Sequence, residues 1–591
     1  MKKLAVPLLA GSLAVCACRD RSEPGPVVTA PSATTTVPAQ SRPELVKIQQ
    51  MAEQDGQAVA RAFARLEHAA TARDAPAARE AYLGLRRAWR RLLPLSSLLE
   101  YAATIEPDSD EADEVPADLG LKPLGKAVTA EPPNWDALGS SLRRTSPAAR
   151  LAPSEPRAIA LSLPKLADAL SRAVFHWGVM LDGSAADTPD EQRIDVIDGG
   201  RALLVYVGEV SALAGGPERL SKAGARFDAW LGANEKSPRI TGKLDGLLSS
   251  AELGAALRTA LAAKGATVLP PFAPRRPTQA DLFAEPVSVA TFPRLPGAAP
   301  DGQLAALGKR LFGDVRLSRD RTLSCASCHR EGAALSAGRV RPKRFDHKPV
   351  ARDVPGLLNV AYEPMLLWDG RASTLARQAE IAVTEEMGGD FRAIASELSR
   401  DAELAKALPT GLTQDTITKA LEAHQRTLIS DDSPFDRYVR GDRNALSAAQ
   451  LRGFDLYYGE ARCSRCHRLP LTSGTEAPRF TRAETAAIGV PRRPGVREID
   501  PDPGRGAIER REAERHRFKI PSLRNLPKTA PYFHNGSFRT LDEVVDFYVA
   551  GAGEGLGIAP AAFDDDARAF TVTPEDRRAL IDFLTRGLSE R

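Results

Sequence analysis

Two five-residue stretches, Cys325-Ala-Ser-Cys-His329 and Cys463-Ser-Arg-Cys-His467, determine how this 591-residue chain is interpreted. In each stretch the cysteines stand at i and i+3 and the histidine at i+4, so one helical turn places all three side chains on one side. This pattern is typical of covalent haem attachment, in which the thiols bond to the haem vinyl groups and the histidine binds the iron. His329 and His467 are the expected proximal ligands of two c-type haems.

A structural zinc site built from both Cys-x-x-Cys pairs is the alternative. Zinc ribbons place their pairs roughly 15–20 residues apart, whereas Cys325 and Cys463 are 138 positions apart. Zinc also does not require the histidine that follows each pair. The other two cysteines, Cys16 and Cys18, lie near the start of the chain. Haem therefore remains the favoured interpretation.

The first eighteen residues have the pattern of a signal peptide. Two lysines precede the apolar run Leu4–Val15, which is too short to span a bilayer. The run ends at Cys16-Ala-Cys18, which loosely resembles a lipoprotein cleavage site with Cys18 as the lipid-bearing residue. Residues 19–43 are rich in Pro, Ser, Thr and Ala and predict a disordered tether. We expect a periplasmic protein that is either anchored by a lipid on Cys18 or simply secreted.

The composition is ordinary for a soluble protein, with 43% hydrophobic and 26% charged residues. The 80 basic and 76 acidic residues nearly balance, for a net charge of +4. This balance gives no support for nucleic acid as a partner.

Residues 44–265 show a helical pattern and predict an N-terminal helical bundle domain. Apolar residues recur at three- and four-residue steps in Ala78–Leu93 and Leu166–Leu181. The expected buried face of the first segment consists of Ala78, Tyr82, Leu85, Trp89 and Leu92. Prolines at 270–271, 274 and 277 mark a linker, placed at 266–294.

The rest of the chain divides into two further helical domains, 295–445 and 446–591, each with one haem motif. Thr540 and Glu543 form a capping-box pattern that predicts a helix ending at Gly551. Thr573, followed by Pro574, predicts the start of the last helix. No run of alternating strands is visible, so the expected fold is all-α, with a helical bundle followed by two cytochrome c-like domains.

Several stretches of residues 295–591 resemble one enzyme family in sequence and in order. They are Leu307-Gly-Lys-Arg-Leu-Phe-Gly-Asp-Val-Arg-Leu-Ser318, the first haem motif, Trp368-Asp-Gly-Arg371, Gln378-Ala379, Glu386-Met387, Phe518-Lys-Ile-Pro-Ser-Leu-Arg-Asn525 and Thr529-Ala-Pro-Tyr-Phe-His-Asn-Gly536. The family is that of bacterial di-haem cytochrome c peroxidases. Its superfamily includes the MauG-type enzyme of methylamine utilisation, which oxidises a protein substrate.

The resemblance implies that hydrogen peroxide reacts at the first haem and that the second haem passes electrons. Trp368 would relay electrons between the haems. Glu386 would move protons during O–O cleavage, with Gln378 beside it. The segment between Gln378 and Glu386 is about two residues shorter than the family pattern, which leaves Glu385 as a substitute for Glu386.

The family also suggests the sixth iron ligands. His347 would cap the first haem, although a loop histidine without iron contact is the alternative. Many members use methionine at the second haem, but no methionine follows Cys463. Tyr548 stands at the ligand position, as in the MauG-type enzyme, and His534 is the fallback. A phenolate ligand favours oxidised iron and lowers its potential.

A calcium ion is the remaining cofactor that the resemblance implies. Asp353 and the backbone carbonyls of Thr529 and Pro531 would hold it, and oxygen ligands of this kind suit calcium.

These observations predict a di-haem peroxidase supplied by a small cytochrome or cupredoxin. A MauG-like oxidase of partner-protein residues is the alternative within the superfamily, and a non-catalytic electron carrier is the alternative from another class. Residues 81–89 and 98–101 faintly resemble imelysin-like helical domains. That likeness raises an iron- or haem-binding role, although His68 and His176 are isolated.

Overall fold

The computed structural model describes residues 43–99, 120–154, 156, 161–183, 186, 188–266, 302–338, 341–407, 411–475, 477 and 480–590. The predicted signal peptide, the predicted tether and almost all of the predicted linker at 266–294 lie outside these residues. Residues 44–591 group as one compact unit. Among the described residues, no helix has both the length and the apolar character needed to cross a membrane.

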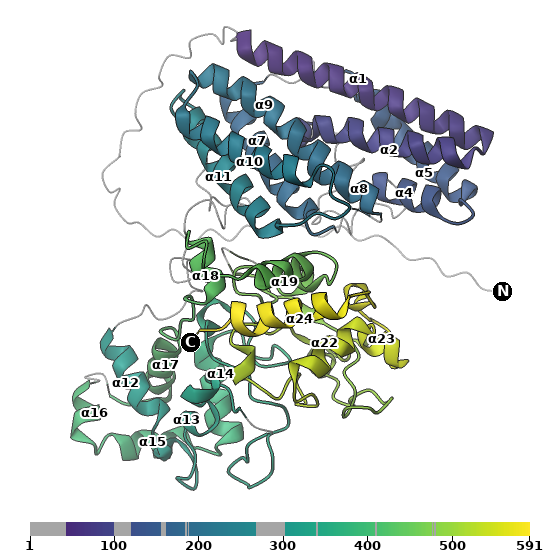
Figure 1. Cartoon of the computed structure of the whole chain (residues 1–591). Coiled ribbons are helices and arrows are strands. Elements are labelled where there is room, and N and C mark those ends of the chain that lie inside the picture. Colours follow the sequence, from purple (N-terminus) through teal and green to yellow (C-terminus); the bar gives the residue numbers. More distant parts are fainter. Residues whose placement is uncertain are drawn as a thin grey trace, which may run out of the picture. The chain divides into compact units, whose positions relative to one another are not determined.

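The N-terminal part is built from helices that run side by side in Figure 1. They are α1 (Pro43–Ala72), α2 (Ala75–Leu92), η1 (Leu93–Leu98), α4 (Leu121–Thr129), α5 (Trp135–Leu151), α7 (Leu163–Met180), α8 (Pro189–Arg193), η2 (Ile194–Asp198), α9 (Gly199–Ala214), α10 (Glu218–Asn234) and α11 (Lys243–Ala262). Asp74 caps α2 by accepting the Ala77 N–H. All five residues expected on the apolar face of α2 are buried, which confirms that prediction.

A cluster of buried charges lies inside this bundle. Arg86 pairs with Glu191 at 2.9 Å and donates through Nε to Asp195 at 2.7 Å. Arg90 donates to the same Asp195 carboxylate at 2.7 Å. Every one of these side chains is at most 1% exposed. Removing one member of this network would leave an uncompensated buried charge. The ion pairs therefore hold α2 against α8 and η2 in one arrangement.

Short helices and long loops make up the part with the first haem motif. Its elements are α12 (Gly302–Phe312), η4 (Val315–Leu317), α13 (Cys325–Cys328), η5 (Glu331–Ala333), η6 (Val360–Tyr362), α14 (Leu375–Ile381), η7 (Ala382–Glu386), α15 (Phe391–Leu398), α16 (Ala402–Ala407), α17 (Gln414–Gln425) and α18 (Pro434–Val439). Gly308 allows α12 to approach α17 closely, because a Cβ there would lie 1.8 Å from the Ala420 carbonyl oxygen.

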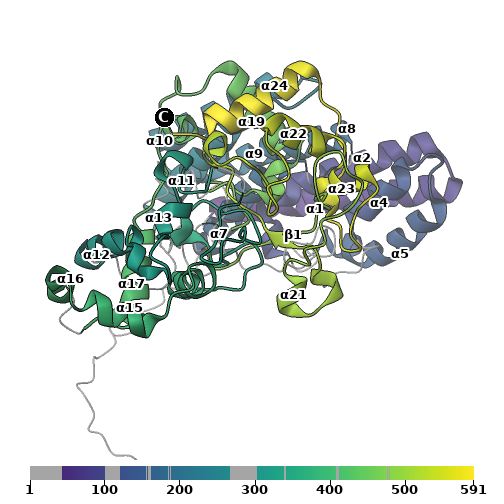
Figure 2. The ribbon, with the colours of Figure 1, turned by 90° about the horizontal axis from the view of Figure 1, so that it is seen from below.

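The part with the second haem motif has a similar construction and carries the two short strands, of which Figure 2 labels β1. Its elements are α19 (Ala448–Tyr458), α20 (Cys463–Cys466), β1 (Thr485–Ala486), α21 (Gly506–Glu509), η8 (Glu512–Glu514), β2 (Phe518–Lys519), η9 (Leu526–Lys528), α22 (Leu541–Val549), α23 (Ala552–Leu556), η10 (Asp565–Ala567), α24 (Pro574–Asp582) and η11 (Phe583–Gly587). The antiparallel strands pair Thr485 with Lys519 and Ala486 with Phe518. The all-α prediction is confirmed, as are the Thr540 capping box and the Thr573 cap.

The hydrophobic cores divide unevenly between these parts. The first haem part has its own cluster, which includes Leu311, Leu375 and Ile417. The cluster of the N-terminal bundle instead continues into the second haem part through Phe454, Tyr458 and other residues.

Polar contacts reinforce this continuity at the start of α11. The amides of Gly242 and Lys243 donate to the Asp455 carboxylate of α19 at 2.8 and 2.7 Å. Asp455 therefore satisfies two N–H groups that the first turn of a helix leaves without partners. The Tyr458 hydroxyl of α19 also donates to the Gly178 carbonyl of α7 at 3.3 Å. Helix α19 leads within five residues to Cys463, so the bundle is attached close to the second haem motif.

Candidate functional site: two haem-attachment motifs joined through Trp368

Both Cys-x-x-Cys segments form single helical turns, α13 and α20, as the sequence predicts. His329 follows α13, and its Nδ1 lies 2.8 Å from the Leu335 carbonyl oxygen. His467 follows α20, and its Nδ1 lies 2.9 Å from the Pro521 carbonyl oxygen. A carbonyl oxygen only accepts, so each Nδ1 carries the proton and each Nε2 keeps its lone pair. Both imidazoles are therefore prepared to bind a metal through Nε2.

Burial favours the protonation states that haem attachment and ligation need. It lowers the pKa of His467 to about 4 and lowers that of His329, so both rings are neutral at pH 7. The same burial raises the pKa of Cys325 and Cys463 to about 12. None of the four described cysteines forms a disulfide. Free thiols and neutral histidines fit covalently attached haem.

An apolar cavity surrounds the second motif and could hold the haem. It is lined by Cys463, Cys466, His467, Trp368, Ile520, Leu523, Tyr532, Phe533, Val544, Leu580 and further apolar side chains. Phe518, His534 and Tyr548 also line it. The cavity thus combines both thiols, the proximal histidine and the residues predicted for the other face of the haem.

Tyr548 projects from α22 into this cavity. Burial is the main cause that raises its pKa well above the usual range, and the nearby Cys466 and Cys463 thiols add to it. The phenolate form consequently needs a positive partner such as iron. Tyr532, which lines the same cavity, uses its hydroxyl to donate to the Leu526 carbonyl at 3.0 Å. The assignment of Tyr548 as an iron ligand stays a prediction.

Trp368 belongs to the first haem part but forms part of the wall of the second haem cavity. Its indole N–H donates to the Asp353 carbonyl at 2.8 Å, and its own carbonyl accepts the Lys519 N–H at 2.8 Å. Its ring lies edge-on to His534, with centroids 6.4 Å apart. Trp368 is therefore fixed between the two haem parts by contacts with both.

The Asp353 side chain is buried near the residues predicted to bind calcium. Its amide donates to the His534 carbonyl at 2.7 Å, while its Oδ1 has no hydrogen-bond partner among the described residues. Burial raises its pKa to about 7. A methyl group on Gly536 would contact both Pro531 and Asp353, which places these two residues close together. A buried carboxylate oxygen without a partner fits a cation site, whereas no contact of Thr529 tests its part in it.

The structure distinguishes the two candidate acids at the end of η7. Glu386 is partly buried, its Oε2 has no hydrogen-bond partner among the described residues, and burial raises its pKa. The Glu385 side chain is 56% exposed, with Arg371 at 3.9 Å. A carboxyl that keeps its proton to higher pH suits proton transfer, so Glu386 is the better candidate. Gln378 lies partly buried on α14, and its place beside Glu386 stays a prediction.

His347 lies on the surface, in a turn where its N–H donates to the Arg344 carbonyl at 2.9 Å. Its backbone is left-handed, with φ of 63°. Its assignment as a ligand of the first haem stays a prediction.

Comparison with known proteins identifies the family. Residues 302–444 match the family model of di-haem cytochrome c peroxidases. The methylamine utilization protein MauG of Methylophilus methylotrophus is 36% identical over 292 residues, which cover 47% of this chain and 81% of that protein. The chain belongs to this di-haem peroxidase and MauG family.

A further curated relative and a solved structure are also similar to the chain. The cytochrome-c peroxidase IdrP2 of Denitromonas iodatirespirans is 31% identical, over 48% of this chain and 82% of that protein. A crystal structure of a MauG-like protein associated with microbial copper homeostasis is 31% identical, covers 50% of this chain and 93% of that one, and has a TM-score of 0.46. Like other members of the di-haem peroxidase family, the protein is an oxidoreductase with two haem cofactors. The family model begins at residue 302, so the imelysin-like resemblance of the N-terminal helices stays a prediction.

Sequence reasoning missed the ionic contacts that support Trp368. Arg352 pairs with Asp369, the neighbour of Trp368, at 2.6 Å and with Asp502 at 2.7 Å. The Arg352 guanidinium also lies over the Phe518 ring. The motif Trp368-Asp-Gly-Arg371 contains Asp369. Only the fold identifies its ion-pair partner Arg352, which stands 17 positions earlier in the chain.

Proposed function

We propose that the protein is a peroxidase that reduces hydrogen peroxide to water with electrons from an outside donor. The haems supply redox-active iron when bound. The chain's own residues hold and move protons and fix the groups between the haems. The observation that carries this proposal is the position of Trp368. It lines the second haem cavity, while its indole donates to Asp353 of the first haem part and Arg352 pairs with the adjacent Asp369.

Glu386 is the proposed proton-transfer group of the peroxide site. Its carboxyl is partly buried with a raised pKa, and Arg344 and Arg371 are close enough to oppose that rise. The guanidinium groups also favour the ionised form once the proton has left. Glu386 could thus hold a proton before the reaction and remain stable after releasing it.

Peroxide consumption by the haem-loaded protein with a reduced c-type cytochrome tests this function directly. We expect turnover in the wild type and strong loss in Glu386→Gln. Absence of peroxide consumption with cytochrome, cupredoxin and ferrocyanide donors would contradict the proposal.

Oxidation of residues on a partner protein is the second candidate function, and Tyr548 favours it. An oxygen ligand stabilises oxidised iron, and no methionine follows Cys463 to act instead. A peroxide-dependent, cytochrome-independent change in the mass of a co-purified partner would support this candidate. The third alternative, a non-catalytic carrier, does not agree with membership of an enzyme family.

Two further features belong to the proposal. Asp353, with the carbonyls of Thr529 and Pro531, would hold one calcium ion, supported by the unpartnered Asp353 Oδ1. Residues 1–18 would export the chain to the periplasm, with Cys18 as a possible site of lipid attachment to the membrane. Mass spectrometry of the mature protein tests the export and the lipid, and also counts the attached haems.

A further inference from the structure

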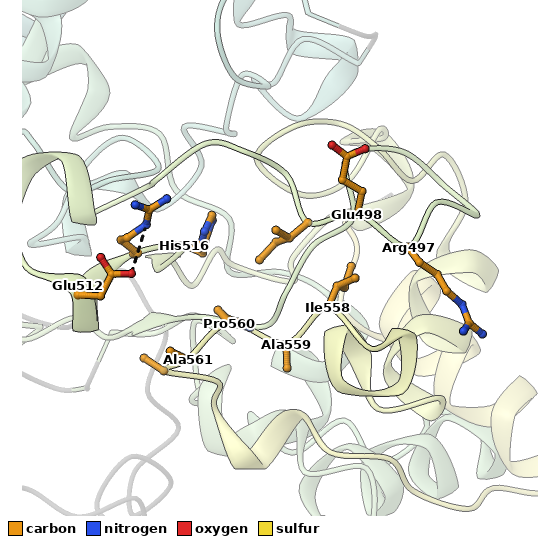
Figure 3. Close-up of a pocket in the computed structure, with 11 residues that line it drawn as sticks. Arg497, Glu498, Glu512, His516, Ile558, Ala559, Pro560 and Ala561 are labelled. Carbon is orange, nitrogen blue, oxygen red and sulfur yellow. Dashed lines mark ion pairs between the residues drawn. The ribbon is translucent and has the colours of Figure 1, made fainter.

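A second cavity, of about 520 Å³, lies in the second haem part and shares no lining residue with the haem cavity. Three segments form it: Arg497–Ile499, residues of Glu512–His516, and 558–562. In Figure 3 Ile558, Ala559 and Pro560 form an apolar side, and Glu498 and Glu512 lie toward opposite ends. Glu512 pairs with Arg515 at 3.7 Å.

His516 lines this cavity toward the Glu512 end (Figure 3). Its Nδ1 lies 3.0 Å from the Asp502 carbonyl oxygen. Because a carbonyl only accepts, Nδ1 carries a proton, and in the neutral ring Nε2 is a lone-pair acceptor. The imidazole therefore offers an acceptor to a ligand and is held in one orientation by the backbone.

The backbone conformation of His516 supports a functional role for its side chain. Its φ is 59°, in the left-handed region, which a residue with a Cβ rarely adopts. Glycine would adopt this conformation without strain. Holding an imidazole at such a position is consistent with a role for the side chain itself.

The lining indicates what kind of molecule fits. The lining contains two arginines, 497 and 515, and two glutamates, 498 and 512, so its formal charges balance. A neutral ligand therefore suits the cavity better than an anion or a cation. The apolar side favours a flat ring, and His516 Nε2 needs a hydrogen-bond donor. A phenol combines a ring with one such donor.

The cavity is also close to the proposed path of electrons. Phe518 follows His516 by two residues, a span of at most about 7 Å along the backbone. Phe518 lines the second haem cavity and stacks on His534, with ring centroids 3.6 Å apart. The intervening Arg517 is fixed by its Nε hydrogen bond to Thr485 at 3.1 Å.

We propose that this cavity binds a phenol ring as a reducing substrate, with the phenol O–H donated to His516 Nε2. The phenol comes from a small molecule or from a tyrosine of a partner protein. This inference rests on the proposed peroxidase function. Two phenols each lose one electron and the O–H proton, which His516 accepts and passes to water. Hydrogen peroxide takes up the two electrons and two protons and becomes two waters, and the phenoxyl radicals leave.

Binding is measured first, on the oxidised, haem-loaded protein without peroxide. p-Cresol is titrated, and the broadening of its NMR lines reports binding. His516→Gly removes the acceptor and relieves the backbone, so it should fold. Ala559→Phe fills an exposed part of the cavity. We expect each variant to raise the Kd for p-cresol about tenfold. His516→Gly does so by removing one hydrogen bond, and Ala559→Phe by occupying the space of the ring. The matched control Arg510→Gly has the same left-handed backbone, with φ of 54°, but does not line the cavity, and should leave the Kd unchanged.

Unchanged p-cresol binding in both cavity variants would overturn the inference, as would an equal loss in Arg510→Gly. Peroxide-dependent oxidation is then compared for p-cresol and for the peptide Gly-Tyr-Gly in the same variants. Oxidation of p-cresol alone assigns a small phenol, and oxidation of both admits a protein tyrosine. Peroxide consumption with ferrocyanide separates the two proposals: if it persists while p-cresol fails to bind, only the phenol site is wrong. If it is absent while p-cresol binds at His516, the peroxidase function is wrong and the binding site stands.

Discussion

The indole N–H of Trp368 donates a 2.8 Å hydrogen bond to the carbonyl of Asp353, whose own amide donates to the His534 carbonyl. One backbone unit thus connects Trp368 to the loop of His534, which lines the cavity at the second haem motif. The same Asp353 carries the unpartnered carboxylate oxygen of the proposed calcium site. The proposed electron relay and the proposed cation site are therefore expected to depend on each other.

Trp368→Phe should lower both stability and peroxide turnover. The change leaves the buried Asp353 carbonyl without its donor, which costs about 1–3 kcal/mol. It also replaces the indole with a ring that is harder to oxidise. Chemical unfolding and stopped-flow reduction of the first haem measure the two effects.

Trp230→Phe is the matched control for this change, because the Trp230 indole donates an equivalent 2.8 Å bond to the Gly242 carbonyl in the N-terminal part. It should lower stability by a similar amount and leave the reduction rate unchanged. Equal slowing in both variants would show that Trp368 acts only through stability.

Removal of the proposed calcium ion should make stability depend on pH through Asp353. Burial raises the pKa of this carboxyl from 3.8 to about 7, so the folded chain holds the proton more tightly than the unfolded chain. Without calcium, stability is therefore highest below about pH 4 and falls as the pH rises toward about 7. Calcium binds the ionised form, so its stabilising effect should grow over the same interval.

Thermal unfolding between pH 4 and 8, with EDTA or with calcium, measures this dependence. Asp353→Asn should remove both the fall and the calcium response, whereas Asp442→Asn, on the surface, should remove neither. A calcium response that survives in Asp353→Asn would place the ion elsewhere.

Glu386→Gln should reduce the kcat/KM for peroxide by about 100-fold or more, the usual contribution of a positioned acid–base group. Glu385→Gln changes the adjacent, exposed carboxylate and should remain close to the wild type. If Glu385→Gln shows the larger loss, the shorter segment after Gln378 has shifted the catalytic acid by one position.

Tyr548→Met should raise the midpoint potential of the second haem and change its EPR spectrum. A thioether favours reduced iron, whereas a phenolate oxygen favours oxidised iron. Tyr532→Phe removes a hydroxyl from the same cavity that is already bonded to Leu526 and should leave the spectrum unchanged. Identical spectra for Tyr548→Met and the wild type would exclude Tyr548 as a ligand.

The features that the sequence predicted are those that depend on neighbouring residues. The Cys-x-x-Cys turns, the Thr540 capping box and the buried face of α2 all follow from spacing within one helix. The contacts of Trp368 with Asp353 and of Arg352 with Asp502 join residues 15 and 150 positions apart. No local pattern encodes such pairs, and the left-handed backbone of His516 likewise depends on the loop around it.

The attachment of the N-terminal helices to the second haem part is the clearest feature of this non-local kind. Asp455 caps α11 from 212 positions away and lies near the fully buried Lys243, whose Nζ is 4.0 Å from Glu460. Asp455→Ala should cost about 0.5–2 kcal/mol, as for loss of a helix cap. Because the hydrophobic cluster is continuous, this loss should lower the unfolding midpoint seen by haem absorbance and by far-ultraviolet circular dichroism equally.

Asp74→Ala tests this coupling from the opposite side. Asp74 caps α2, within the N-terminal bundle, through a 3.0 Å bond from the Ala77 amide. If the bundle and the second haem part unfold together, this variant should lower the haem-absorbance midpoint as well, although Asp74 belongs to neither haem part. A shift confined to circular dichroism would mean that the two parts unfold separately and that Asp455 joins independent domains.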